Sequence, residues 1–367
     1  MRIAISCRSL EYASGGVKEY LVSLINELLT IDKKNTYVLF HSQVSFFGSF
    51  PGAEEVSLYC SNRLLFDWWK LPGALKRHGI DLAFFPSSNM PPGVPCKSVT
   101  AMMDLGYFHT AYRMYALPDT MYMKWAMRRT ATRSQHFLAI SGHTKADMTR
   151  ILGIPDEKIT VTHLAADGLY HQPVAEDEVM RFRRRHGLTR PFFLYTGNIS
   201  PRKNLRALLE AFAAVKDRVQ ADLVVTGGLS WNNAWDSWVA RLGITDRVHR
   251  LGFVERQDMP VLYKAALAFV FPTLFEGFGL PVLEAQAVGV PVICADNTSL
   301  PEVAGDSARM IDGTDIPALS QALADVAADA ALRERLVALG HANERRFSWR
   351  ATAEKTLGVF ERVHREG

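Results

Sequence analysis

A glycine-rich segment in the second half of the chain carries two carboxylates at a spacing that could do chemistry. Residues 271–284 read F-P-T-L-F-E-G-F-G-L-P-V-L-E, a hydrophobic run, a turn and the start of a helix with Pro281 in its first turn. Glycines beside a helix N-terminus leave backbone N–H groups open to phosphate. Glu276 and Glu284, eight positions apart, would accept hydrogen bonds from hydroxyl groups. The segment therefore suits a ligand with both phosphates and hydroxyls.

A basic loop is the second such segment. Residues 197–204 read G-N-I-S-P-R-K-N, and the loop begins with Gly197 and Asn198 after an expected strand. The carboxyl ends of parallel strands are where α/β sheets bind ligands. Arg202 and Lys203 would lie at the start of the next helix, where the helix dipole disfavours cations. A bound anion would account for them.

Strands that alternate with amphipathic helices must position these segments. We expect strands at residues 2–6, 37–40, 56–59, 82–86, 99–103, 137–140 and 159–163, and again at 192–197, 223–227, 248–252, 267–272, 292–295 and 309–311. After the first strand, Tyr20, Leu21, Leu24 and Leu28 follow helical spacing. This alternation predicts an α/β fold with two Rossmann-like doubly wound domains.

The length of 367 residues favours two domains, because single cores rarely grow so large. Residues 165–190 interrupt the alternation and include an acidic-then-basic helix, E-D-E-V-M-R-F-R-R-R-H-G-L. We expect this segment to link the domains and to lead into the second one. We predict an N-terminal domain over residues 1–170, a second domain over 171–345, and a C-terminal helix over 346–367 that packs back on the first domain.

Composition excludes several classes of protein. The chain is 48% hydrophobic and 22% charged, as in ordinary globular proteins, and its net charge of +4 does not indicate a nucleic-acid binder. Its four cysteines form no CxxC pair, which is typical of a reducing cytosol. The N-terminus lacks the apolar core of a signal peptide. We expect a cytoplasmic protein without a nucleic-acid partner.

One basic stretch leaves two interpretations open. Aromatic, sulfur-containing and cationic side chains are mixed at Tyr122, Met123, Trp125, Met127, Arg128, Arg129 and Arg133. They would form a half-buried helix with a solvated basic face, or a surface that meets anionic lipid or a lipid-linked acceptor. The second interpretation predicts peripheral contact with the inner face of the cytoplasmic membrane.

Together, the two motifs resemble a known family. E-G-F-G-L-P-V-L-E is similar to the EX7E motif of retaining family 4 glycosyltransferases with the GT-B fold, and G-N-I-S-P-R-K-N to that family's basic loop. The resemblance covers essentially the whole chain. It implies two Rossmann-like domains that face each other across a cleft.

The resemblance also implies roles for single residues. Arg202 and Lys203 would neutralise the donor diphosphate, Glu276 would contact the transferred sugar, and Glu284 would hold the ribose hydroxyls. The remaining donor contacts come from loop positions close to the phosphates and the sugar: Gly16, Gly197, Asn198, Phe278, Gly279 and Leu280.

The chain departs from the family pattern in the first domain. Many members have a His-Asp pair after the strand at residues 99–103, whereas this chain has Met103-Asp104. Asp104 matches, and His109, five positions later, could replace the missing histidine.

The implied reaction is retaining transfer of a sugar from a nucleotide-diphosphate donor, with mannose from GDP-mannose as first expectation. The acceptor would be a glycan or polyprenyl-linked glycan of bacterial surface polysaccharide. Because the chain has no Asp-x-Asp pair, we expect no metal, and no cofactor, since the donor is a substrate. A sugar-nucleotide epimerase of similar fold and an inactive sugar-nucleotide-binding scaffold remain the alternatives.

Overall fold

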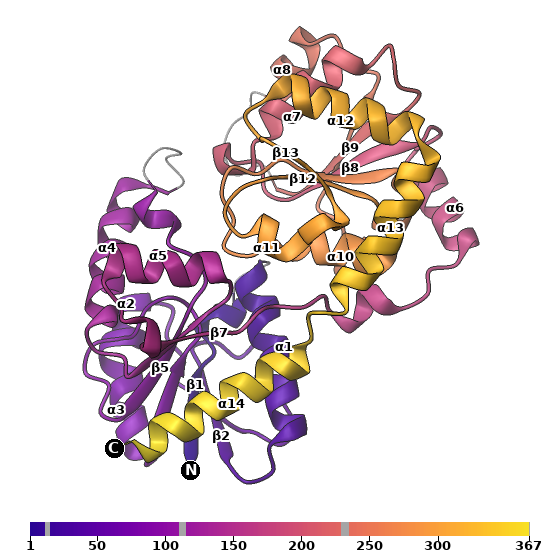
Figure 1. Cartoon of the computed structure of the whole chain (residues 1–367). Coiled ribbons are helices and arrows are strands. Elements are labelled where there is room, and N and C mark those ends of the chain that lie inside the picture. The colour runs from indigo at the N-terminus through magenta and orange to yellow at the C-terminus, as the bar shows by residue number, and fades with distance from the viewer. Residues whose placement is uncertain (12–14, 110–114, 229–234, 367) are drawn as a thin grey trace. The chain divides into compact units, whose positions relative to one another are not determined.

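The computed structural model describes residues 1–11, 15–109, 115–228 and 235–366, which form two compact units (Figure 1). Within the described residues, the first unit is drawn from Met1–His109, Tyr115–Leu164 and Ser348–Gly367. The second unit is drawn from Ala165–Phe347. The division therefore falls at 164/165 and 347/348, against the expected 170/171 and 345/346.

A seven-stranded parallel sheet forms the centre of the first unit, in the order β3-β2-β1-β4-β5-β6-β7. Ile3 of β1 pairs with Tyr37 of β2 on one side and with Leu82 of β4 on the other. The strands are β1 (Arg2–Ser6), β2 (Thr36–His41), β3 (Glu54–Ser57), β4 (Leu82–Phe85), β5 (Lys97–Met102), β6 (His136–Ala139) and β7 (Ile159–Val161).

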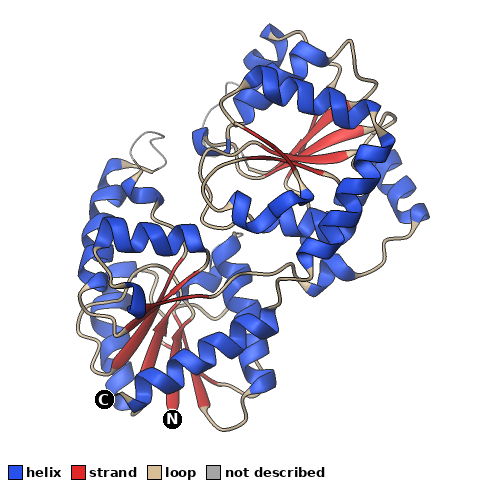
Figure 2. Cartoon of the chain, in the orientation of Figure 1, coloured by secondary structure: helices blue, strands red, loops and turns tan. Residues whose placement is uncertain are grey.

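Helices flank this sheet (Figure 2). They are α1 (Gly16–Ile31), α2 (Arg63–Leu65), η2 (Phe66–Lys70), α3 (Leu71–Arg77), η3 (Gly106–Phe108), α4 (Leu117–Ala131) and α5 (Gly142–Leu152), with short turns at η1 (Arg8–Glu11) and η5 (Asp156–Lys158). The periodic apolar side chains of α1, such as Tyr20 and Leu24, are buried, as predicted. Helix α5 begins at Ser141, whose hydroxyl accepts a hydrogen bond from the Thr144 N–H.

The last helix, α14 (Trp349–Arg365), completes the first unit. Trp349 lies against Tyr20 of α1, with ring centroids 6.2 Å apart, and Phe360 lies 5.3 Å from Phe84 of β4. At its C-terminal end, Lys97 Nζ of β5 donates to the Val363 carbonyl at 3.0 Å. The end of the chain is thus part of the unit that its beginning forms.

The second unit has a six-stranded parallel sheet in the order β10-β9-β8-β11-β12-β13. Its central strands are buried on both faces and read as apolar runs, as parallel strands between helices do. The strands are β8 (Phe192–Thr196), β9 (Asp222–Thr226), β10 (Val248–Gly252), β11 (Ala268–Phe271), β12 (Val292–Ala295) and β13 (Arg309–Ile311).

The helix expected within residues 165–190 is α6, and it packs on the second unit. Val179 and Phe182 of α6 (Glu176–Arg185) pack with Tyr170 and Leu188 in one buried cluster. The other helices are η6 (Gly168–His171), η7 (Pro201–Lys203), α7 (Leu205–Val215), α8 (Trp235–Arg241), η8 (Arg256–Asp258), α9 (Met259–Ala265), α10 (Leu280–Val288), α11 (Leu300–Ala304), η9 (Gly305–Ser307), α12 (Ile316–Ala328) and α13 (Ala330–Glu344). Among the described helices, none has the length and apolar run that crossing a bilayer requires.

The predicted fold class is confirmed, and every expected strand has a counterpart. The bounds differ most at β3, expected over residues 56–59 and found at Glu54–Ser57. This edge strand is held by a polar contact, an ion pair of 2.7 Å between Arg2 and Glu54, whereas Tyr59 beyond it is exposed. The apolar residues up to Tyr59 therefore led to a predicted strand that begins and ends two residues too late.

Candidate active site

The basic loop and the glycine turn meet at the carboxyl edge of the second sheet. The basic loop follows β8 and the turn follows β11, and these two strands are neighbours. Arg202 Nη1 lies 2.8 Å from Glu276 Oε1, and Lys203 Nζ lies 2.7 Å from the same oxygen. The topology therefore brings Glu276 to Arg202 and Lys203, although it lies more than seventy positions after them in the chain.

Glu276 is 9% exposed, and Oε1 of its carboxylate accepts the bonds from Arg202 and Lys203. Thr273 Oγ1 donates to Oε1 at 2.9 Å, and the Glu276 N–H donates to Thr298 Oγ1 at 3.2 Å. Burial alone would raise the pKa of the Glu276 carboxyl, but Lys203 and Arg202 outweigh it and hold that pKa below its usual range. The carboxylate is therefore ionised at neutral pH.

The charges of this cluster do not cancel. We expected a bound anion to account for Arg202 and Lys203, and the structure places the Glu276 carboxylate against both. Two cations against one carboxylate leave the three side chains with one excess positive charge. The cluster thus holds its cations rigidly and still favours a further anion.

Asn204 and Arg202 brace the basic loop and the glycine turn against each other, a role that the sequence did not indicate. Asn204 Nδ2 donates to the carbonyls of Pro272 at 3.0 Å and Gly313 at 2.6 Å. Arg202 Nη1 also donates to the Phe275 carbonyl at 2.7 Å. Asn204 has a φ of 55°, a left-handed conformation that asparagine tolerates better than most residues. The residue type of Asn204 and its place directly after Arg202 and Lys203 were the features of the sequence that could have indicated this role.

The glycine turn ends at the N-terminus of α10. Gly279 is the N-cap with a φ of 116°, and a Cβ there would lie 2.5 Å from Leu300 Cδ2, so the position requires glycine. Ser299 Oγ donates to the carbonyls of Glu276 at 3.1 Å and Phe278 at 2.6 Å. Leu280 is the first residue of α10 and Pro281 follows it, as predicted. The turn is therefore fixed at the helix end where an anion is favoured.

Glu284 lies one turn inside α10 and has a partner that the sequence did not reveal. Its Oε2 accepts a hydrogen bond from the Tyr263 hydroxyl of α9 at 3.0 Å. Burial, followed by the nearby Glu284 charge, raises the pKa of Tyr263 well above its ordinary value. Tyr263 therefore stays protonated and donates, which orients the Glu284 carboxylate.

A third loop constrains the start of the basic loop. The Gly197 N–H donates to the Thr226 carbonyl at 3.1 Å, and Asn198 next to it is exposed. Gly227 has a φ of 126°, and a Cβ there would lie 2.2 Å from the Gly197 carbonyl oxygen. This contact makes Gly227 a structural requirement of the site, which the two glycines after the strand do not by themselves indicate.

In the first unit, the expected residues lie near the carboxyl ends of β1 and β5. Gly16 is the first residue of α1. Asp104 Oδ1 accepts from the Gly106 N–H at 2.8 Å, and the Met103 N–H donates to Ser88 Oγ at 3.0 Å. Asp104 thus caps a turn that leads towards His109.

His109 pairs with Asp147, a residue of α5 that the sequence reading missed. His109 Nε2 lies 2.9 Å from Asp147 Oδ2, while Arg150 forms an ion pair with the other carboxylate oxygen. Burial would raise the pKa of Asp147, but the bonds from Arg150 and His109 lower it below the usual range. A buried, ionised partner fixes the orientation of the imidazole ring.

The described residues contain no group of three or more His, Cys, Asp and Glu side chains that could hold a metal ion. The second unit offers a cationic cluster, a helix N-terminus and a carboxylate that can accept hydrogen bonds from hydroxyl groups. The first unit offers an oriented histidine. This chemistry suits phosphate and hydroxyl recognition in one unit and proton handling in the other.

Two family models match the two parts of the chain in succession. The family model described as Glycosyltransferase Family 4 matches residues 14–167, and the model Glycosyl transferases group 1 matches residues 176–341. The O-antigen chain mannosyltransferase B of Escherichia coli is 28% identical over 98% of this chain and 99% of its own length. The serotype-specific mannosyltransferase WbdA of Escherichia coli is 26% identical over 74% of this chain, which spans about a third (34%) of that longer protein.

A solved structure supports the fold independently. Anabaena Alr3699/HepE in complex with UDP and glucose superposes with a TM-score of 0.78 and 15% identity, covering 98% of this chain and 99% of that chain. Two family models in succession, together with this architecture, identify the enzyme class. The chain belongs to the family 4-like glycosyltransferases with the GT-B fold and is a hexosyltransferase.

Proposed function

We propose that this enzyme transfers a hexose from a nucleotide-diphosphate donor, with retention of anomeric configuration. The observation that carries the proposal is the Arg202–Lys203–Glu276 cluster beside the N-terminus of α10. A departing nucleotide diphosphate develops negative charge, which fixed cations and helix amides stabilise. The excess positive charge of the cluster is suited to that task.

The other site residues contact the ribose, the transferred sugar and the phosphates of the donor. Glu284, oriented by Tyr263, accepts hydrogen bonds from the ribose hydroxyls. Glu276 contacts the transferred sugar, and the amides at Phe278, Gly279 and Leu280 face the sugar and the phosphates. Gly197 and Asn198 contact the donor from the basic loop, and we also assign Gly16, the first residue of α1, to the donor phosphates.

On the acceptor side, we assign His109 and Asp104 to the reacting hydroxyl. The glycosidic bond to the donor phosphate breaks, and the acceptor oxygen forms the new bond on the same face. The acceptor proton passes to the leaving phosphate, with no covalent enzyme intermediate. His109, held by Asp147, positions the hydroxyl for this transfer.

The working substrates are GDP-mannose and a lipid-linked glycan in bacterial surface-polysaccharide synthesis. Support comes from the relative matched over its whole length, which is named as an O-antigen chain mannosyltransferase. A polyprenyl-linked acceptor would place the enzyme at the inner face of the cytoplasmic membrane, as a peripheral protein.

The test is a transfer assay with GDP-mannose, UDP-glucose and ADP-glucose, with and without a polyprenyl-diphosphate-linked glycan acceptor. We expect acceptor-dependent release of the nucleoside diphosphate with GDP-mannose, and an NMR spectrum of the product with the donor's anomeric configuration. Consumption of donor without any acceptor would indicate an epimerase. Donor binding without turnover on any acceptor would indicate an inactive scaffold.

A further inference from the structure

Large apolar side chains are exposed on two neighbouring segments of the first unit, the run α2–η2 and the helix α4. Trp69 is 74% exposed and Met121 is 65% exposed, values unusual for side chains of this size. We call the following set the η2–α4 surface: Leu64, Leu65, Trp68, Trp69, Met121 and Trp125.

The two segments form one continuous surface. Trp68 of η2 stacks on Trp125 of α4, with ring centroids 6.1 Å apart. Arg63 of α2 lies over the Tyr122 ring at 5.2 Å and donates to the Met123 sulfur at 3.4 Å. These contacts fix the two segments side by side, so their exposed side chains act together.

The surface is also cationic. Its segments carry Arg63, Lys70, Lys124, Arg128 and Arg129 against Asp67 and Asp119. Asp67 is buried and engaged by Arg8 at 3.6 Å and Arg63 at 3.7 Å, which leaves Asp119 as the exposed carboxylate of these two segments. A partner with negative charge is therefore favoured.

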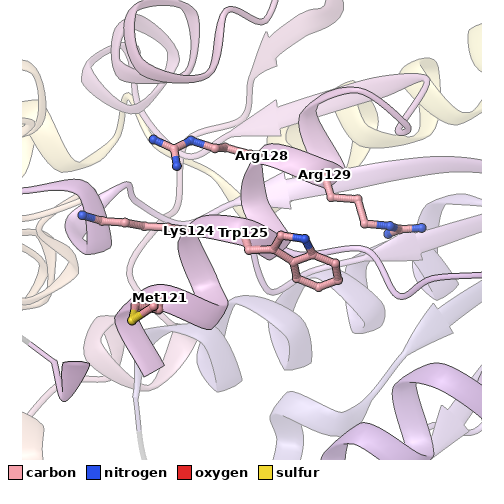
Figure 3. Close-up of a pocket in the computed structure, with 5 residues that line it drawn as sticks. All are labelled: Met121, Lys124, Trp125, Arg128 and Arg129. Atoms are coloured by element: carbon pink, nitrogen blue, oxygen red, sulfur yellow. The ribbon is translucent and has the colours of Figure 1, made fainter. Parts of the chain in front are cut away.

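The cations of α4 point in two directions. A shallow hollow of about 530 Å³ is lined by Met121, Lys124, Trp125, Arg128 and Arg129. Figure 3 shows Lys124 and Arg128 extending to one side of α4 and Arg129 extending to the other. Lys124 and Arg128 lie over the Phe108 ring, at 5.6 Å and 5.3 Å. Spread charges suit an extended anionic surface better than a single small ligand.

We propose that the η2–α4 surface docks the enzyme on an anionic lipid bilayer, with Trp69, Trp125 and Met121 entering the interfacial layer. Tryptophan prefers the boundary between headgroups and acyl chains, and lysine and arginine beside it attract anionic headgroups. The aliphatic side chains Leu64 and Leu65 offer nothing to a hydroxyl-rich glycan. A symmetric second copy would place these basic faces against each other.

The inference rests on the proposed function in one respect, the lipid-linked acceptor. Helix α4 begins at Leu117, shortly after His109 in the chain. Docking through α4 would bring the membrane-anchored end of such an acceptor to the same part of the first unit as His109.

The experiment is co-sedimentation of the full chain with vesicles of phosphatidylcholine alone or with added phosphatidylglycerol. We expect binding that requires phosphatidylglycerol and weakens with salt. Trp69→Ser combined with Met121→Ser should lower the partition coefficient roughly tenfold or more, because both side chains leave the apolar interface. Lys124→Glu combined with Arg128→Glu should abolish the phosphatidylglycerol dependence.

Met180→Ser is the matched control, because Met180 is 50% exposed on α6 of the second unit. It should bind vesicles like the wild type. Vesicle binding equal to wild type in both double variants would overturn the proposal. So would protection of Trp69 fluorescence by free acceptor glycan but not by vesicles, or a concentration-dependent dimer that Trp69→Ser dissolves.

The binding of nucleotide sugar by the same variants separates the two proposals. The surface variants should retain it, because they lie outside the donor site. If the surface variants lose vesicle binding and keep donor binding, the result bears on the η2–α4 surface and not on the proposed function. Absence of donor binding in the wild type would instead count against the proposed function.

Discussion

At the scale of single residues, the Glu276 carboxylate decides how the basic loop is held. Its ionised form faces Lys203 and Arg202 and accepts from Thr273, so the cluster has little freedom before any ligand arrives. Preorganised charges of this kind stabilise a developing anion without reorganisation. Removing Glu276 would leave two neighbouring cations facing each other, which is costly in a buried place.

Lys203→Ala should lower kcat/KM about 10²–10³-fold, the cost of losing one donor to a developing anion. Glu276 would keep Arg202 and Thr273 as partners, so the free energy of unfolding should change little. Steady-state kinetics and a thermal melt measure the two quantities. The control is Lys264→Ala, which removes an exposed lysine of α9 and should leave the kinetics unchanged. Near-wild-type kcat/KM for Lys203→Ala would refute its role at the diphosphate.

Site residues that stand in a recognisable motif could be predicted from the sequence. Those whose role depends on a partner far along the chain could not. Arg202, Lys203, Glu276 and Glu284 stand in recognisable loops. Tyr263 stands in no motif, and its partner lies on another helix. Asp147 and Gly227 were missed for the same reason, because only the folded chain brings them to His109 and Gly197.

At the scale of elements, the loop after β9 fixes the loop after β8. Gly227→Ala would drive a Cβ into the Gly197 carbonyl, and its φ of 126° is strained for alanine. We expect destabilisation of roughly 2–4 kcal/mol and weaker donor binding, because the start of the basic loop must move. Chemical denaturation measures the first effect and donor titration the second.

Gly187→Ala is the matched control, since Gly187 also has a positive φ, of 65°, but an added Cβ there meets no atom within 4 Å. It should cost about 1 kcal/mol and leave donor affinity intact. Equal effects of the two substitutions would mean that the contact with Gly197 is unimportant.

The docking of α14 should depend on pH through His136. Burial, and then the charge of Arg362, lower the pKa of this imidazole to about 4. Arg362 Nη2 lies 3.0 Å from His136 Nε2, where it donates to the neutral ring. The folded state therefore binds the proton more weakly than the unfolded chain, whose histidine titrates near pH 6.5.

This difference in pKa sets the direction in which the free energy of unfolding changes with pH. The stabilisation is fully present above about pH 6.5 and is lost as the pH falls towards 4. Between pH 7 and pH 5 we expect His136 to cost roughly 1–2 kcal/mol of unfolding free energy. In His136→Gln, which cannot titrate, urea melts over that range should show a smaller fall. An equal fall in both proteins would exclude His136 as the cause.

Strands and helices were predictable because their patterns are local. Buried parallel strands appear as apolar runs, and α1 repeats its apolar residues at helical spacing. The segment 165–190 was harder, because Val179 and Phe182 find their partners elsewhere in the second unit. An acidic-then-basic helix was expected in this segment, whereas the buried cluster in which it packs could not be predicted.

At the scale of the whole molecule, the candidate functional residues are distributed over two successive Rossmann-like halves. The second half holds all candidate donor residues except Gly16, and the first half, completed by α14, holds Gly16, His109 and the η2–α4 surface. The class of enzyme could be inferred from the sequence because two specific motifs recur in a recognised fold. The identities of base and sugar could not, because side chains from several loops jointly recognise them.

The central claim is that the second unit binds a nucleotide-diphosphate sugar through the Lys203 cluster and Glu284. The most direct measurement is the thermal stability of the protein with UDP-, GDP-, ADP- and dTDP-sugars, without added metal. A ligand at 100 times its Kd adds roughly 2.7 kcal/mol of stability. The account predicts stabilisation by one nucleotide class, lost in Glu284→Ala. No stabilisation by any of these donors, or an undiminished shift in Glu284→Ala, would contradict it.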